Sequence, residues 1–156
     1  MDSLHDRLIS GDELLSLLRE RLAEGQTIRY LPFRGVSMLP MLRQGKDAVE
    51  LSTLPQRLKK YDLPVYQYPS GKVVMHRVIA VRQDHYVCMG DNTYEKEYIR
   101  HEQMIAVVTA FTRGERVIPV TDPGYRLYCR IWVATMPLRK FVRRIKNRLK
   151  RMLRAK

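Results

Sequence analysis

Residues 27–120 contain a succession of short segments rich in Val, Ile, Tyr and Thr, most of them bounded by turn residues such as Pro69-Ser70-Gly71. Such segments favour extended strands, and groups of Pro, Ser and Gly favour turns. Many short strands with turns between them are typical of an all-β domain. The sequence therefore predicts a mainly β body, with strands over 27–33, 47–54, 63–69, 72–83, 85–90, 104–113 and 115–120.

Helical patterns flank this body on both sides. Ser10 and Glu13 have the spacing of a capping box, and Gly25 is a natural helix end. Between them an apolar face recurs at helical spacing, which predicts an amphipathic helix over 11–24 with Leu14, Leu15, Leu18 and Leu22 on that face. After Pro137 a similar apolar period is interleaved with Arg and Lys, which predicts a basic amphipathic helix over 137–156.

Charge is distributed unevenly along the chain. Of 29 Lys and Arg and 16 Asp and Glu in the 156 residues, residues 126–156 hold 12 basic side chains and no acidic one. A nearly neutral body therefore carries a strongly basic tail, and an electrostatic partner should meet the tail. We expect three parts: an N-terminal helical segment over 1–26, a β domain over 27–122 and a basic amphipathic tail over 123–156.

Several classes of protein are disfavoured by the sequence. No segment has the roughly 18 apolar residues that span a bilayer, and the N-terminus lacks the features of a secretory signal. We therefore expect a cytoplasmic protein, with peripheral attachment to the cytoplasmic face of the membrane through residues 137–156 as an open alternative. Cys88 and Cys129 are too few for a disulfide framework, and His85, His101 and Cys88 lack metal-ligand spacing. We expect neither a metal nor a cofactor.

Three short clusters contain residues that could perform chemistry. The first is Gly35-Val36-Ser37-Met38-Leu39-Pro40, where a glycine allows close approach of a substrate and a proline fixes the turn after the serine. The second places His76 inside the apolar run 73–81, and the third is Gly90-Asp91-Asn92, followed by Glu95 and Glu97. Each cluster taken alone is most often structural, as a turn or as a packed histidine.

In this order, however, the three clusters resemble the sequence boxes of the signal peptidase I family. The first is similar to the family's G-x-S-M-x-P box, and Gly90-Asp91-Asn92 is similar to its G-D-N box. His76-Arg77-Val78 resembles the box that is K-R-V in bacterial members and H-R-V in the endoplasmic-reticulum and archaeal type. Asp62-Leu63-Pro64-Val65-Tyr66 resembles the family's G-D-I-V strand, with Tyr61 in place of the glycine. The resemblance covers about residues 28–112.

The resemblance implies a serine endopeptidase of the Ser/His type that cleaves leader or signal-type peptides. It implies the coiled β-sheets of the LexA/signal peptidase fold for the catalytic domain. Ser37 would be the nucleophile and His76 the general base, with the Ser37 N–H donating to the oxyanion. The acid that orients the histidine would be Asp91 or Glu97. Many bacterial members add a serine hydroxyl two residues before the nucleophile, a place that Gly35 occupies here.

Two other functions remain open at this point. The chain could be a catalytically silent relative that binds peptides or a partner, or a LexA-type regulator whose tail binds nucleic acid. The second fits less well, because those proteins use a lysine base and carry a separate helix-turn-helix domain, for which a single helix over 11–24 is too little. For the tail, an anionic lipid surface, nucleic acid and simple packing on the body are the competing partners.

Overall fold

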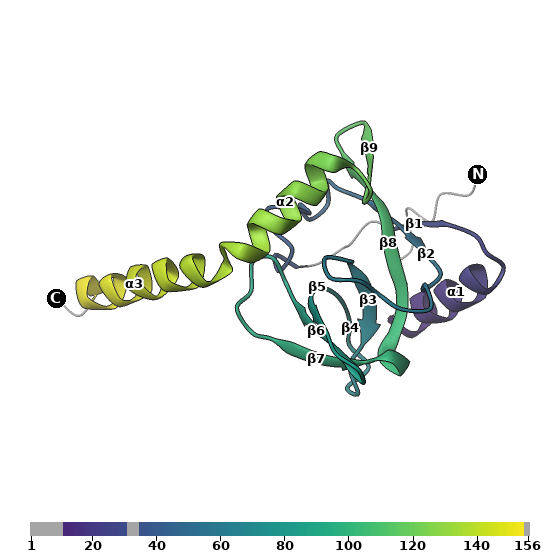
Figure 1. Cartoon of the computed structure of the whole chain (residues 1–156), viewed down its shortest axis with the longest axis horizontal. Helices are drawn as coiled ribbons and strands as arrows, with labels where there is room; N and C mark the ends of the chain where they lie inside the picture. Colours follow the sequence, from purple (N-terminus) through teal and green to yellow (C-terminus); the bar gives the residue numbers. More distant parts are fainter. Residues whose placement is uncertain (1–10, 31–34, 155–156) are drawn as a thin grey trace.

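The computed structural model describes residues 11–30 and 35–154 (Figure 1). Two antiparallel β-sheets form the body, one helix precedes the first strand, and two helices follow the last strand. The predicted mainly β body with flanking helices is confirmed. Each of the seven predicted segments contains a strand, although residues 31–33 of the first lie outside the described part.

The larger sheet has six strands built around one long central strand. Its order is β1-β2-β8-β3-β4, and β9 pairs with β8 beyond this path. Its strands are β1 (Ile28–Tyr30), β2 (Val49–Ser52), β3 (Pro64–Gln67), β4 (Val73–Met75), β8 (Met104–Arg113) and β9 (Arg116–Pro119). Register shifts interrupt β8 in its pairing with both β2 and β3. Such irregularities increase local twist and bend the strand.

The smaller sheet contains β5 (Arg77–Val81), β6 (His85–Met89) and β7 (Glu97–Arg100) in that order. The predicted strand over 72–83 is divided at His76, so that its first part joins the larger sheet as β4 and its second part joins the smaller sheet as β5. Strand β7 was not among the predicted segments. A short 3-10 helix, His101–Gln103, connects β7 to β8.

Helix α1 (Gly11–Ala23) packs its apolar face into the core of the larger sheet. Leu15, Leu18 and Leu22 are buried as predicted, whereas Ser10 and the side chain of Leu14 lie outside the described residues. The helix ends where predicted, because Gly25 takes a φ of +72° that favours glycine, and the Gly25 and Gln26 N–H groups bond back to carbonyls of the last turn.

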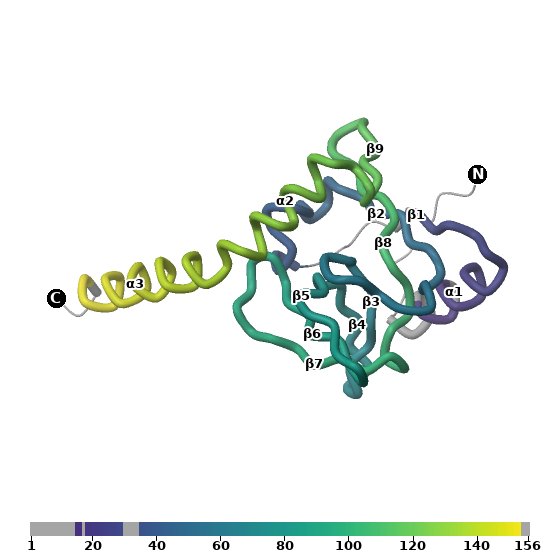
Figure 2. Tube along the Cα trace, viewed as in Figure 1, coloured from purple at the N-terminus to yellow at the C-terminus, as the bar shows by residue number. Residues whose placement is uncertain are grey.

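The C-terminal segment forms two helices rather than the one predicted. Helix α2 (Pro123–Ala134) packs on the body and is capped by Asp122, whose side chain accepts from the Tyr125 N–H. Helix α3 (Met136–Arg154) extends away from the body, as Figures 1 and 2 both show. The sequence Asp122-Pro123 is itself a helix-start signal, and it could have revealed α2. Within residues 11–30 and 35–154, none of the helices combines the length and the apolar character needed to cross a membrane.

The buried face of α1 generates a stability prediction. Leu18 is 2% exposed and packs in the core cluster that the larger sheet forms, so Leu18→Ala should leave a cavity there. We expect this substitution to lower the free energy of unfolding by about 2–5 kcal/mol. The neighbouring substitution Arg19→Ala, on the exposed face, should leave stability nearly unchanged. Urea unfolding followed by circular dichroism measures both. Equal stability of the two variants would contradict the packing of α1.

Candidate active site

Ser37 lies in a turn that is fixed by the buried residues that follow it. Met38, Met41 and Leu42 are all buried and belong to the core of the larger sheet, whereas Ser37 itself is half-buried. The Leu39 N–H donates to the Val36 carbonyl, and Leu42 N–H donates to the Met38 carbonyl. The core thus holds the turn in place and leaves its serine at the surface. Phe33 and Arg34, which precede the serine box, lie outside the described residues.

The turn of Ser37 rests directly on the segment 90–92. The Asn92 N–H donates to the Ser37 carbonyl at 2.7 Å, and Asn92 Nδ2 donates to the Val36 carbonyl at 3.1 Å. A Cβ atom at position 90 would lie 2.7 Å from the Ser37 carbonyl oxygen and 3.1 Å from Ser37 Cβ. Carbon cannot approach an oxygen that closely, so the contact requires glycine at position 90.

His76 lies at the end of the smaller sheet where Gly90 follows β6. It is 7% exposed and occupies the break between β4 and β5. Arg77 of β5 pairs with Met89 of β6 in an antiparallel ladder. His76, just before Arg77, and Gly90, just after Met89, therefore face each other across the end of this ladder. Ser37, which contacts Gly90, therefore approaches the His76 region. Among the described residues no hydrogen bond joins Ser37 to His76, and such bonds often tighten only when substrate binds.

The inner nitrogen of His76 is held by a carboxylate and a phenol. Glu97 Oε2 lies 2.8 Å from His76 Nδ1, and the Tyr66 hydroxyl lies 3.2 Å from the same nitrogen. Tyr66 also donates a hydrogen bond to Glu97. Glu97 reaches this position because it begins β7 and pairs with Cys88 of β6, while Tyr66 comes from β3 of the other sheet. The site thus joins the two sheets.

The charges of this group determine which nitrogen of His76 carries a proton. Burial alone would raise the pKa of Glu97, but hydrogen bonds from His76, Tyr66 and Tyr68 outweigh it and lower that pKa below its usual value. Burial and the hydrogen bond to Glu97 raise the pKa of Tyr66, which keeps the phenol protonated. An ionised carboxylate only accepts hydrogen bonds, so Nδ1 carries the proton of the neutral imidazole. Nε2 is then left as a proton acceptor.

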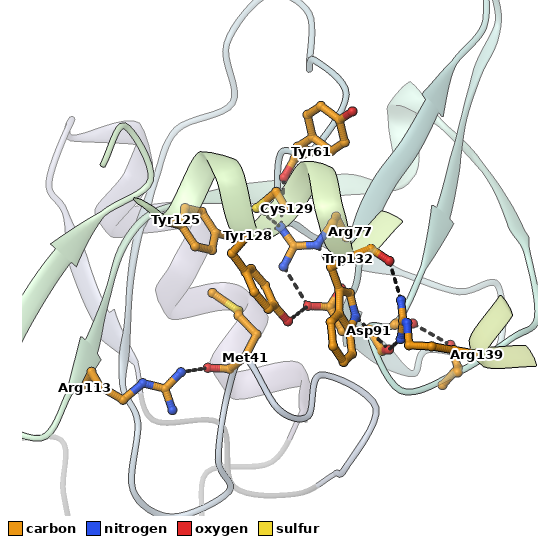
Figure 3. A network of polar contacts seen from close by, with 12 residues as sticks. Met41, Tyr61, Arg77, Asp91, Arg113, Tyr125, Tyr128, Cys129, Trp132 and Arg139 are labelled. Carbon is orange, nitrogen blue, oxygen red and sulfur yellow. Dashed lines mark hydrogen bonds and ion pairs between the residues drawn. The ribbon is translucent and has the colours of Figure 1, made fainter. Parts of the chain in front are cut away.

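Asp91 has different partners, although the sequence left it equal to Glu97 as the orienting acid. It forms a two-pronged ion pair with Arg77, with Nε–Oδ1 and Nη2–Oδ2 distances of 2.8 Å, and both side chains are fully buried (Figure 3). The Tyr128 hydroxyl also donates to Asp91 Oδ2 at 3.0 Å. The acid that contacts His76 is Glu97, whereas Asp91 is buried and pairs with Arg77, the residue that follows His76.

Arg77 and Tyr66 are important side chains that the sequence analysis did not select. Arg77 Nη1 donates to the Tyr61 carbonyl, to the Tyr125 hydroxyl and to Cys129 Sγ. In the sequence, Arg77 is only the second residue of the histidine box. Tyr66 belongs to the predicted strand over 63–69, and no spacing in the sequence links it to His76. The contact arises because β3 pairs with β4, the strand that leads into His76.

Comparison with known proteins adds no assignment to this geometry. No known family model matches the chain, and no curated protein matches its sequence. In the described part of the chain, no group of three or more His, Cys, Asp and Glu side chains is placed to hold a metal ion.

The different surroundings of the two acids predict different effects of their removal. Asp91→Ala leaves the fully buried Arg77 guanidinium without its counter-charge, and we expect a loss of about 3–5 kcal/mol in the free energy of unfolding. Glu97→Gln keeps an oxygen acceptor at a half-buried position, and we expect a loss of only about 1 kcal/mol. Denaturant unfolding of the three proteins measures both effects. The reverse order of stabilities would contradict these roles.

Proposed function

We propose that this protein is a serine endopeptidase with Ser37 as nucleophile, His76 as general base and Glu97 as the residue that orients the base. The observation that carries the proposal is the hydrogen bond from His76 Nδ1 to Glu97. It lies at the end of the smaller sheet where Gly90 contacts the turn of Ser37. A carboxylate on Nδ1 and a free Nε2 is the arrangement by which an imidazole activates a serine.

The proposed reaction has two halves. In the first, Ser37 Oγ attacks the carbonyl carbon of the scissile peptide while His76 Nε2 takes the hydroxyl proton, and the protonated imidazole then gives this proton to the leaving amine. In the second, water attacks the acyl-serine ester, and His76 again transfers the proton, which regenerates the serine. Glu97 keeps the proton on Nδ1 throughout and stabilises the imidazolium that forms.

The oxyanion of each tetrahedral intermediate needs a donor close to Ser37. The backbone N–H of Ser37 is the natural candidate, since no carbonyl within 11–30 and 35–154 accepts a hydrogen bond from it. Preorganised donors of this kind contribute about 3–4 kcal/mol to catalysis in serine proteases. The rigid turn, held by Met38 and Met41 in the core, would keep this donor in place.

The conformation of Tyr61 supports the proposal that this domain has the coiled sheets of the LexA/signal peptidase fold. The resemblance places Tyr61 where that family has glycine, and Tyr61 has a φ of +84°. This left-handed conformation is uncommon for a residue with a bulky side chain and favours glycine. The chain therefore keeps a glycine-like backbone at a position where the resemblance expects one. The same resemblance directs the proposed activity to leader or signal-type peptides with small residues before the cut.

The triad assignment predicts the activity of three variants. Ser37→Ala and His76→Ala should each remove nearly all cleavage of peptides that contain an Ala-x-Ala site, because each removes a reacting group. Glu97→Gln should lower kcat by roughly 100-fold to 10,000-fold, since an amide can donate to Nδ1 and so favour the wrong tautomer. Mass spectrometry of the cleaved peptides gives both the rate and the site.

The chain offers matched controls for this experiment. His85 forms a similar hydrogen bond, with 2.7 Å between its Nδ1 and Asp84 Oδ1, but this pair lies at the surface. Ser70 is likewise an exposed turn serine. His85→Ala and Ser70→Ala should cleave like the wild type. Full activity of the Ser37 or His76 variant would reject the mechanism, and an inactive wild type over a broad peptide library would favour the silent, peptide-binding alternative.

The close contact at Gly90 predicts a separate effect on activity. Gly90→Ala places a methyl group against the Ser37 carbonyl, so the turn of Ser37 must shift. We expect a loss of stability of about 1–3 kcal/mol together with a loss of kcat of roughly 100-fold, because small displacements of a reacting group are costly. Assays at a temperature where the variant is fully folded separate the two effects. An unchanged kcat under those conditions would contradict a catalytic role for this turn.

A further inference from the structure

Helix α3 has an unusually complete apolar stripe that the body does not cover. Every residue over 141–153 is exposed. Large apolar side chains with exposed fractions between 42% and 77% recur at helical spacing along it: Leu138, Phe141, Val142, Ile145, Leu149, Met152 and Leu153. At about 100° per residue, these seven positions fall within an arc of about 120°. An exposed stripe of this size marks an interaction surface.

The remainder of the helix surface is basic. Helix α3 contains nine Lys and Arg and no Asp or Glu: Arg139, Lys140, Arg143, Arg144, Lys146, Arg148, Lys150, Arg151 and Arg154. These positions cover the arc that the apolar stripe leaves free. A helix with one apolar face and an otherwise cationic surface fits a partner that is apolar on one side and anionic at its boundary.

The first turns of α3 are fixed to the body through the helix side opposite the stripe. Arg139 Nη1 donates to the Asp91 carbonyl at 3.1 Å, and its guanidinium lies 3.6 Å from the centre of the Trp132 ring (Figure 3). Arg143 donates to the Asn92 carbonyl at 3.3 Å, and Lys140 donates to the Tyr94 carbonyl at 3.4 Å. By helical geometry these three positions lie about 100° to 160° from the middle of the apolar stripe. The stripe therefore faces away from the body.

We propose that α3 lies in the interface of an anionic lipid bilayer, with the apolar stripe inserted among the acyl chains and the basic side chains at the headgroups. A second copy of α3 fits poorly, because two such helices would bring together two sets of nine like charges. Nucleic acid would satisfy the basic side chains but leave the apolar stripe in water. An anionic membrane surface satisfies both faces of the helix at once.

This placement also orients the proposed active site. The body is attached to the polar side of α3, so it lies on the aqueous side of the interface. The carbonyl groups that hold the helix belong to Asp91 and Asn92, and the Asn92 N–H bonds to the Ser37 carbonyl. The turn that carries Ser37 is thus connected, through Asn92, to the first turns of the membrane-bound helix. Under the proposed function, this would place peptide cleavage close to the membrane surface.

The test is binding of the full chain to vesicles in a sedimentation assay. Vesicles of phosphatidylcholine alone should bind it weakly, and vesicles with about one third phosphatidylserine should bind it strongly. Near an anionic surface each basic side chain contributes about fivefold to binding. The triple variant Arg144→Gln, Lys146→Gln, Lys150→Gln should therefore weaken binding by roughly 100-fold, and high salt should weaken wild-type binding.

A second variant tests the apolar stripe. Ile145 and Leu149 are exposed on the side of α3 that faces away from its contacts with the body, so replacing both with Gln should preserve the fold. We expect Ile145→Gln with Leu149→Gln to weaken vesicle binding by at least about 10-fold. The matched control is the triple variant Lys46→Gln, Lys72→Gln, Arg116→Gln, which removes three exposed charges from the body and should bind like the wild type. Circular dichroism checks that all variants remain folded.

Several outcomes would overturn the proposal. These are equal binding to neutral and anionic vesicles, no binding to either, or equal losses in the body control and the α3 triple variant. If the apolar variant keeps full binding, the helix adsorbs by charge alone and the inserted stripe is wrong. If a nonspecific DNA duplex binds more tightly than the vesicles and is insensitive to the apolar variant, the partner is nucleic acid. None of these outcomes depends on peptidase activity, which is assayed separately without vesicles.

Discussion

The buried ion pair between Arg77 and Asp91 is the interaction on which the rest of the structure depends. A guanidinium removed from water is tolerated only when its charge and its donors are satisfied. Here Asp91 supplies the opposite charge, while groups of Tyr61, Tyr125 and Cys129 accept hydrogen bonds from the remaining nitrogen of the guanidinium, Nη1. These partners come from a loop before β3, the turn after β6 and helix α2. A single side chain therefore joins three parts of the fold that are distant in sequence.

The same pair organises the candidate site without belonging to its chemistry. Arg77 begins β5 directly after His76, and Asp91 directly follows Gly90, on which the turn of Ser37 rests. Fixing Arg77 to Asp91 therefore fixes the histidine relative to the serine turn. On its other side, the backbone carbonyl of Asp91 accepts hydrogen bonds from Trp132 and Arg139. Asp91 thus holds the candidate site through its side chain and the first turns of α3 through its backbone carbonyl.

Burial distinguishes the His76–Glu97 pair from an otherwise similar pair on the surface. The hydrogen bonds of His76 to Glu97 and of His85 to Asp84 have nearly the same length, 2.8 and 2.7 Å. Asp84, however, is 83% exposed, so water and salt screen its interaction. Glu97 is largely enclosed, and Tyr66 donates to it as well. Only the enclosed pair has the fixed orientation and lowered dielectric that an acid–base role requires.

The sequence by itself determined the features that depend on local pattern. Helical periods located α1 and α3, strand-like composition located the β body, and the order of three short boxes selected Ser37 and His76. Only the tertiary structure decided which carboxylate meets the histidine. Glu97 lies 21 residues from His76, and it reaches His76 because β7 pairs with β6. Composition did not reveal strand β7. The break at His76, which sends β4 and β5 into different sheets, was likewise invisible. Strand pairing and register are set by packing between distant segments, so a local pattern does not contain them.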